Sequence, residues 1–88
     1  MNGVASVLDL GAELRVERRR QGLTQAEVAQ RANVSRAFVI DLERGRRPAA
    51  ELTRVLSVAA ALGLGVALVP SERPSFDDAL KRVLGGSG

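Results

Sequence analysis

Arginine is the residue type in this sequence with the clearest capacity for recognition chemistry. It supplies every basic residue except Lys81. A guanidinium group presents a planar fork of donors that fits phosphate oxygens and the guanine edge better than a lysine ammonium does. Two clusters occur along the chain, Arg18–Arg20 and the group of Arg44, Arg46 and Arg47. This bias favours a nucleic-acid partner, although genomic base composition also produces arginine-rich sequences.

Two residue types that are common in enzyme active sites are missing, and only scattered carboxylates remain for a catalytic role. The 88 residues include no cysteine and no histidine, and the net charge is only +3. Disulfides, thiolate nucleophiles, the commonest metal ligands and the usual general base are thereby removed. We therefore expect no enzyme, no metal and no cofactor. No apolar run reaches the roughly 18 residues that span a membrane, and no secretory signal opens the chain, so we expect a cytoplasmic, nucleoid-associated protein without a membrane partner.

The elements that position these arginines are expected to be helices. The length suits a single domain, and only two aromatic residues are present, which favours a compact helical core of aliphatic side chains. We predict a mainly α, four-helix domain over residues 1–70. Residues 71–88 are expected to form a flexible or partner-docking tail, with one short helix between Phe76 and Leu84.

Capping residues locate the first two helices. Ser6 precedes a helix that is expected to reach about Gln21, with Gly22 as the left-handed residue that ends it. Thr24 and Glu27 form a capping box that opens the second helix.

Further along the chain, Asn33 tolerates the left-handed conformation that a rapid reversal needs. Ser35 then caps a third helix that Gly45 stops, and a fourth helix is expected from about Ala49 to Leu62. Apolar spacing predicts these core residues: Leu10, Leu14, Leu23, Val28, Ala29, Ala32, Val39, Leu42, Leu52, Val55, Leu56, Ala59 and Leu62.

Residues 25–44 meet the demands of two short helices that cross at a sharp angle. Ala29 is small enough for the crossing, and Asn33 suits the turn four positions later. Val34, Val39 and Leu42 are branched apolar residues that clamp the second of these helices. The alternative is a generic helical hairpin that binds no ligand. That alternative is disfavoured, because a generic hairpin would meet all of these independent requirements only by chance.

This segment resembles the Xre, or phage-repressor, helix-turn-helix family. The resemblance rests on Leu23-Thr24-Gln25, Val34-Ser35-Arg36 and Leu42-Glu43-Arg44-Gly45, within about residues 8–64. The family usually has glycine in place of Asn33, which is a mild conformational change. The resemblance implies a lambda-repressor-like fold and double-stranded DNA as the partner. It also implies a structural ion pair between Arg18 and Glu43.

In such a motif the second of the two helices, here the predicted third helix of the chain, lies in the major groove with its first residues at the base edges. The base-reading candidates are then Ser35, Arg36, Ala37 and Asp41. Arg36 can form a fork with guanine, Ala37 can contact a thymine methyl, and Asp41 can accept from cytosine N4. Two alternatives stay open: Ser35 as a helix cap only, and Asp41 as the partner of a nearby arginine.

The candidates for contact with DNA phosphates are Gln25, Arg44, Arg46 and Arg47. The resemblance implies a phosphate contact for Gln25, supported by free backbone N–H groups at the start of its helix. The three arginines flank the recognition helix and would add a salt-sensitive, sequence-independent contribution. For all four, the alternative is a solvated surface side chain.

A single recognition helix reads few base pairs, so a homodimer on a palindromic operator is expected. The short apolar run Val66, Ala67, Leu68 and Val69, closed by Pro70, predicts a β-strand. A lone strand leaves backbone groups unpaired. We therefore expect antiparallel pairing with the same strand of a second subunit, above the packed fourth helices.

The sequence is also similar to a narrower group, the HipB-like antitoxins of type II toxin–antitoxin modules. The features are Phe38-Val39-x-x-Leu42-Glu43-Arg44-Gly45, Glu51-Leu52 and Ala61-Leu62-Gly63-Leu64. This resemblance implies repression of the protein's own operon and neutralisation of a HipA-like serine/threonine kinase toxin. The alternatives are a stand-alone Xre regulator and a pure interaction protein. Arg36 and the arginines that follow argue against the last of these.

Overall fold

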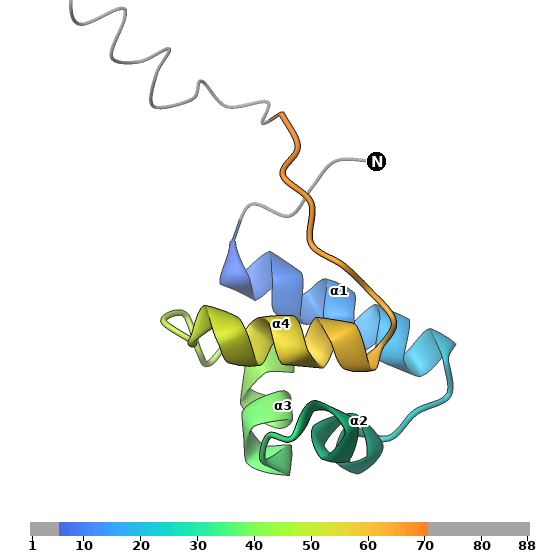
Figure 1. Cartoon of the computed structure of the whole chain (residues 1–88). Helices are drawn as coiled ribbons and strands as arrows, with labels where there is room; N and C mark the ends of the chain where they lie inside the picture. The colour runs from blue at the N-terminus through green and yellow to red at the C-terminus, as the bar shows by residue number, and fades with distance from the viewer. Residues whose placement is uncertain (1–5, 71–88) are drawn as a thin grey trace, which may run out of the picture.

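Residues 6–70 are described by the computed structural model and form four helices joined by short loops (Figure 1). The helices are α1 (Val7–Arg20), α2 (Gln25–Ala32), α3 (Arg36–Glu43) and α4 (Leu52–Ala61). α2 packs against both α3 and α4, and α1 packs against α3. The predicted mainly helical four-helix domain is confirmed for this part of the chain.

Local capping fixes where the first two helices begin. The Ser6 hydroxyl accepts a hydrogen bond from the Asp9 backbone N–H at 3.1 Å. Thr24 Oγ1 accepts from the Glu27 N–H at 3.0 Å, and Glu27 Oε1 accepts from the Thr24 N–H at 2.9 Å. These bonds lower the pKa of Glu27, chiefly through the Thr24 backbone donor. Both predicted caps are therefore present.

The reversal between α2 and α3 depends on Asn33. Its φ of 56° and ψ of 44° place it in the left-handed region, and among residues 6–70 it is the only non-glycine residue with a positive φ. The Val34 N–H then donates to the Ala29 carbonyl at 3.0 Å, which closes the end of α2. Ser35 caps α3 two residues after the reversal, with its hydroxyl 3.0 Å from the Phe38 nitrogen.

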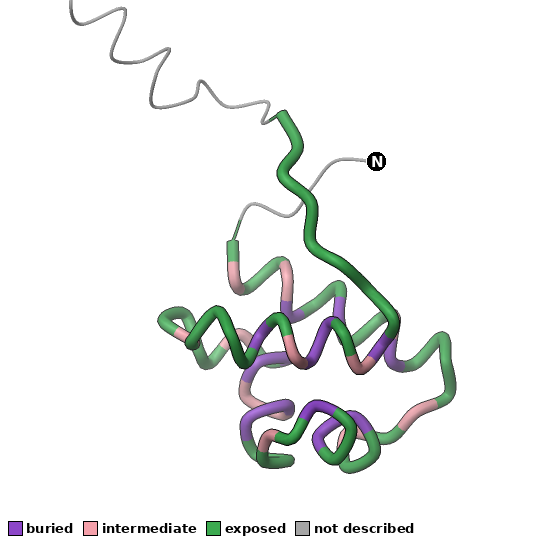
Figure 2. Tube along the Cα trace, in the orientation of Figure 1, coloured by how far each residue is buried: buried purple, intermediate pink, exposed green. Residues whose placement is uncertain are grey.

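The core occupies the space between the four helices, where their inner sides are buried (Figure 2). Phe38 is only 2% exposed, whereas Ile40 on the same helix is half-buried, so Phe38 is the large core residue of α3. The buried apolar residues are Leu14, Val28, Ala29, Ala32, Phe38, Val39, Leu42, Val55, Val58, Ala59 and Leu62. Leu10 and Leu23 pack against this set while partly exposed.

The predicted inner face of α4 was partly wrong. The helix begins at Leu52 rather than Ala49, and Leu52 is 67% exposed. Leu56 also lies on the outer side, and Val58 takes the core position instead. The buried stripe has helical spacing around Val58, but apolar residues occur on both faces of α4, so spacing alone did not distinguish the faces.

α1 and α3 approach each other closely at Gly11. This glycine is buried, and a Cβ atom added to it would collide with the backbone carbonyl of Leu42 in α3. A side chain at this position would therefore force the two helices apart. Sequence patterns alone do not indicate this contact.

Residues 64–70 extend away from the end of α4 without regular structure (Figure 1). No β-strand forms within residues 6–70, and Val66, Ala67, Leu68 and Val69 make no backbone hydrogen bond to another described residue. The predicted strand is thus not formed within one chain, because a strand requires a neighbour for its backbone groups. The tail predicted for residues 71–88 lies outside the described residues.

Candidate nucleic-acid interface

α2 and α3 form a helix-turn-helix whose second helix is held firmly from behind. Val39 and Leu42 are fully buried on the inner side of α3, and Ala29 of α2 is nearly so. The first two residues of α3, Arg36 and Ala37, are exposed, whereas Phe38 in the same turn is buried. Neither of the two exposed side chains has a hydrogen-bond or ion-pair partner among residues 6–70. The outer face of α3 is therefore available to an external partner.

Ser35 and Asp41, the other two predicted base readers, already have partners within the chain. The Ser35 hydroxyl caps α3, which supports the capping interpretation. The Asp41 carboxylate lies 3.8 Å from Arg47 Nε, and both side chains are at least one-third exposed. A solvent-bordered pair of this length contributes little. Asp41 is thus held near Arg47 but can exchange that partner.

The phosphate candidates that follow α3 are exposed, and Arg47 is the most constrained of them. Its guanidinium carbon lies 5.3 Å from the centre of the Phe38 ring, a cation–π distance. Arg54 of α4 lies on the same ring at 5.9 Å. Arg44 and Arg46 have no side-chain partner among the described residues. Arg47 is therefore pre-positioned, whereas Arg44 and Arg46 can adjust to a ligand.

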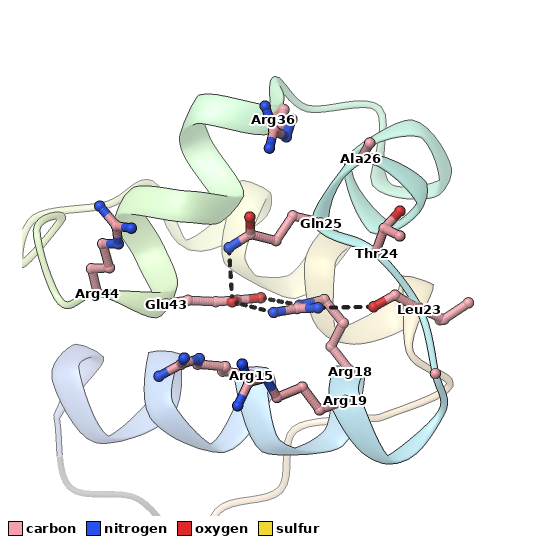
Figure 3. A pocket seen from close by; sticks show the side chains of 11 residues that line it. Arg15, Arg18, Arg19, Leu23, Thr24, Gln25, Ala26, Arg36, Glu43 and Arg44 are labelled. Atoms are coloured by element: carbon pink, nitrogen blue, oxygen red, sulfur yellow. Dashed lines mark hydrogen bonds and ion pairs between the residues drawn. The ribbon is translucent and has the colours of Figure 1, made fainter.

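A buried polar network ties three elements together beneath this surface (Figure 3). Arg18 of α1 donates to both carboxylate oxygens of Glu43, at 2.7 and 3.0 Å, and to the Leu23 carbonyl at 2.8 Å. The bonds to Glu43 raise the pKa of Arg18, although burial opposes this. The ion pair implied by the resemblance is present, and it joins α1 to the end of α3.

Gln25 is part of the same network. Its side-chain Nε2 donates to Glu43 Oε1 at 3.2 Å, so the amide points toward the ion pair (Figure 3). The backbone N–H groups of Gln25 and Ala26 have no acceptor among residues 6–70. A phosphate at the start of α2 would thus meet backbone donors, together with the second hydrogen of the Gln25 amide.

A recess of about 830 Å³ opens above this network. Its walls come from α1, the start of α2, and both ends of α3 (Figure 3). Four exposed arginines line it: Arg15, Arg19, Arg36 and Arg44. The sequence prediction placed Arg19 in a basic cluster but assigned it no DNA contact, and it missed Arg15. Their spacing of four residues, on either side of the buried Arg18, is the signal that could have indicated a shared face.

Within residues 6–70, no three candidate metal-ligating side chains gather. Over the same residues, none of the helices is both long and apolar enough to cross a membrane.

Comparison with known proteins agrees with this geometry. Residues 9–71 match the model of a family described as a helix-turn-helix domain. The chain is 42% identical over 66 residues to the uncharacterised HTH-type transcriptional regulator y4mF of Sinorhizobium fredii, covering 74% of this chain and 86% of that protein. The chain therefore belongs to the helix-turn-helix domain family, and the Xre type predicted from its motifs is confirmed.

A second relative and two solved structures extend the comparison. The immunity repressor protein of Bacillus phage phi105 is 34% identical over 65 residues, which are 74% of this chain but only 44% of that repressor. The restriction-modification controller C.AhdI of Aeromonas hydrophila has a TM-score of 0.62 at 32% identity, over 67% of this chain and 88% of its own. HipB in its O4 20mer complex has a TM-score of 0.75 at 21% identity, over 82% of this chain and 100% of its own. The HipB likeness defines a shared fold.

Proposed function

We propose that this protein represses transcription by binding a specific DNA sequence through α3. The observation that carries this proposal is the division of α3 into two faces. Its inner side is locked into the core by Phe38, while Arg36 and Ala37 stand exposed and unpartnered, among the described residues, at its first turn. A rigidly held helix with free side chains at its N-terminal end has the form that major-groove reading requires. The phage repressor relative supports repression rather than activation.

Arg36 is proposed as the main base reader, through a bidentate contact with guanine O6 and N7. Ala37 would contact a thymine methyl, and Asp41 would accept from cytosine N4 after leaving Arg47. Ser35 serves first as the cap of α3, with its hydroxyl beside the same groove. Gln25, Arg44, Arg46 and Arg47 are proposed to contact phosphates and so fix the position of α3 on the duplex.

The protein is proposed to act as a homodimer on a palindromic site. Apolar side chains are exposed along the segment after α4: Leu64, Val66, Leu68 and Val69. Leu52 and Leu56 are exposed on α4 itself. A second copy would cover these side chains, and antiparallel pairing of residues 66–69 across the two-fold axis would satisfy their backbone groups.

As the more specific role we propose a HipB-like antitoxin that represses its own operon and neutralises a HipA-like kinase. The fold likeness to HipB supports this role, and HipB has also been solved in a HipA-HipB-O2-O3 complex. A stand-alone regulator is the second candidate, and it fits the 42% identity to y4mF, an HTH-type transcriptional regulator, equally well. Co-purification with the product of the neighbouring gene separates the two. If the neighbouring gene does not encode a kinase-like protein, or if its product does not co-purify with this protein, the antitoxin role is excluded.

The central proposal is tested by titrating the protein into labelled duplexes. One duplex comes from its own promoter, and the other has the same length and base composition in shuffled order. We expect specific binding to be at least about a thousandfold tighter than binding to the shuffled duplex at physiological salt. Equal affinity for the two duplexes would overturn sequence-specific repression.

A further inference from the structure

The recess above the Arg18–Glu43 pair is lined by four exposed arginines that come from two helices. Arg15 and Arg19 lie one turn apart on α1, while Arg36 and Arg44 line the same recess at the two ends of α3 (Figure 3). α1 and α3 are far apart in sequence, so four cationic side chains are brought to one hollow by the packing of the helices.

These four arginines have no anionic partner within the described part of the chain, as is also the case for Arg31 and Arg46, but only these four line the recess. Arg18, Arg20, Arg47 and Arg54 each lie within 4.0 Å of a carboxylate. No such contact exists for Arg15, Arg19, Arg36 or Arg44 within residues 6–70. Cationic side chains that line one recess without a counter-ion repel one another, and a bound anion relieves that repulsion.

The carboxylate at the floor of the recess does not repel a bound anion. Glu43 is the carboxylate there, and its charge is matched by the two hydrogen bonds from Arg18. The start of α2 adds the backbone N–H groups of Gln25 and Ala26, which have no acceptor among residues 6–70, and the positive end of the helix dipole. Donors from three directions therefore face the same space.

We infer that Arg15 and Arg19 form, with Arg44, a clamp for phosphates of the DNA strand that passes on the α1 side of the recognition helix. This inference rests on the proposed function, since it assigns α1 a part in the same DNA complex. α1 is thereby a DNA-contacting helix as well as a support for α3. Because the clamp contacts only the backbone, it adds affinity and orientation but no sequence preference.

The test compares the Arg15→Gln/Arg19→Gln double variant with Arg20→Gln and wild type. Arg20 is a neighbour on α1, but it pairs with Glu17 through Nη2 at 2.5 Å and does not line the recess. Glutamine preserves helix propensity. Affinity for the promoter duplex and for the shuffled duplex is measured at several salt concentrations, and circular dichroism verifies that each variant is folded.

The double variant is expected to bind both duplexes more weakly by the same factor. The slope of log K against log salt should become shallower by about 0.9 for each phosphate that a bound subunit no longer neutralises. Arg20→Gln should keep the wild-type slope. Arg15→Lys/Arg19→Lys restores charge and should recover most of the slope.

Three results discriminate between the clamp and the proposed function. If wild type prefers the promoter duplex but the double variant has the same slope as Arg20→Gln, the clamp is overturned and repression stands. If wild type shows no preference while the double variant still has a shallower slope, repression is overturned and the clamp stands. If only the promoter affinity falls, Arg15 and Arg19 read sequence, and the backbone clamp is overturned.

Discussion

The guanidinium of Arg18 and the carboxylate of Glu43 are joined by two hydrogen bonds, with Nε 2.7 Å from Oε2 and Nη2 3.0 Å from Oε1. Both side chains are almost buried, with exposures of 11% and 3%. Arg18 also donates to the Leu23 carbonyl, and Gln25 donates to Glu43. One pair therefore connects α1, the entry to α2 and the end of α3, so that stability and the shape of the DNA-facing surface depend on it together.

Arg18→Ala should destabilise the protein strongly. It leaves the Glu43 carboxylate buried without its counter-ion, which typically costs about 3–5 kcal/mol. Urea denaturation followed by circular dichroism measures the change in the free energy of unfolding. Arg20→Ala on the same helix is the control, because it removes an exposed charge. The Arg18→Met/Glu43→Leu double variant should be more stable than Arg18→Ala, and the pair is not the stabilising element if Arg18→Ala unfolds like Arg20→Ala.

Arg36→Ala and Arg46→Ala should weaken DNA binding in different ways. Loss of Arg36 should cost about 1–3 kcal/mol on the promoter duplex and relax the preference at one base pair. Loss of Arg46 should weaken promoter and shuffled duplexes alike and make the salt slope shallower by about one unit per subunit. Affinities are measured by fluorescence anisotropy across single-base operator variants. Indistinguishable profiles for the two substitutions would remove Arg36 from its role as base reader.

Gly11→Ala should disturb the crossing of α1 and α3. The added Cβ would meet the Leu42 carbonyl, a backbone atom that moves only with its helix. Overpacking of this kind costs about 1–3 kcal/mol, which thermal denaturation detects. Gly65→Ala is the matched control, since nothing lies within 4 Å of its added Cβ. Equal melting temperatures for the two variants would contradict the close approach.

Acid should weaken the attachment of α1 to the end of α4. Hydrogen bonds from Arg20 and then Gln21 lower the pKa of Glu17 from 4.5 to about 2, and Gln21 also donates to the Leu62 carbonyl at 2.7 Å. A lowered folded-state pKa means that the stabilisation is complete above pH 4.5 and is lost as the pH falls from 4.5 toward 2.

Glu17→Gln should therefore flatten the dependence of the melting temperature on pH in that interval. Glu13→Gln is the control, because Glu13 is exposed on the same helix and has no ion pair among the described residues. The effect is moderate, since Glu17 borders solvent and the surrounding water screens its charge. If the melting temperature of Glu17→Gln falls with decreasing pH as steeply as that of wild type, this contribution is excluded.

Leu68→Asp should shift the protein toward the monomer. Leu68 is fully exposed in the single chain and lies in the segment proposed to pair across the dimer axis. A charge there would face the apolar side chains of the second copy and raise the dissociation constant of the dimer. Sedimentation velocity over a range of concentrations measures it. Val16→Asp makes the same chemical change at an exposed position on α1 and should leave the dimer intact.

Local chemistry explains which features the sequence could predict. The caps at Ser6 and Thr24 and the left-handed Asn33 depend on residues a few positions apart, so their types were sufficient. The outer position of Leu52 and the close approach at Gly11 depend on which helix packs opposite, and apolar periodicity does not contain that information. Arg15 was missed for the same reason, since its part in the recess appears only when α1 lies beside α3.

Arg36 and Ala37 contribute no side-chain hydrogen bond or ion pair to the described fold, while the residues behind them on α3 are locked in the core. Substitutions at these two positions should therefore alter the preferred operator at almost no cost in folding. If the proposed reading positions do contact bases, the same fold can acquire new target genes by substitution there, and two paralogues in one cell can come to regulate different genes before their structures differ.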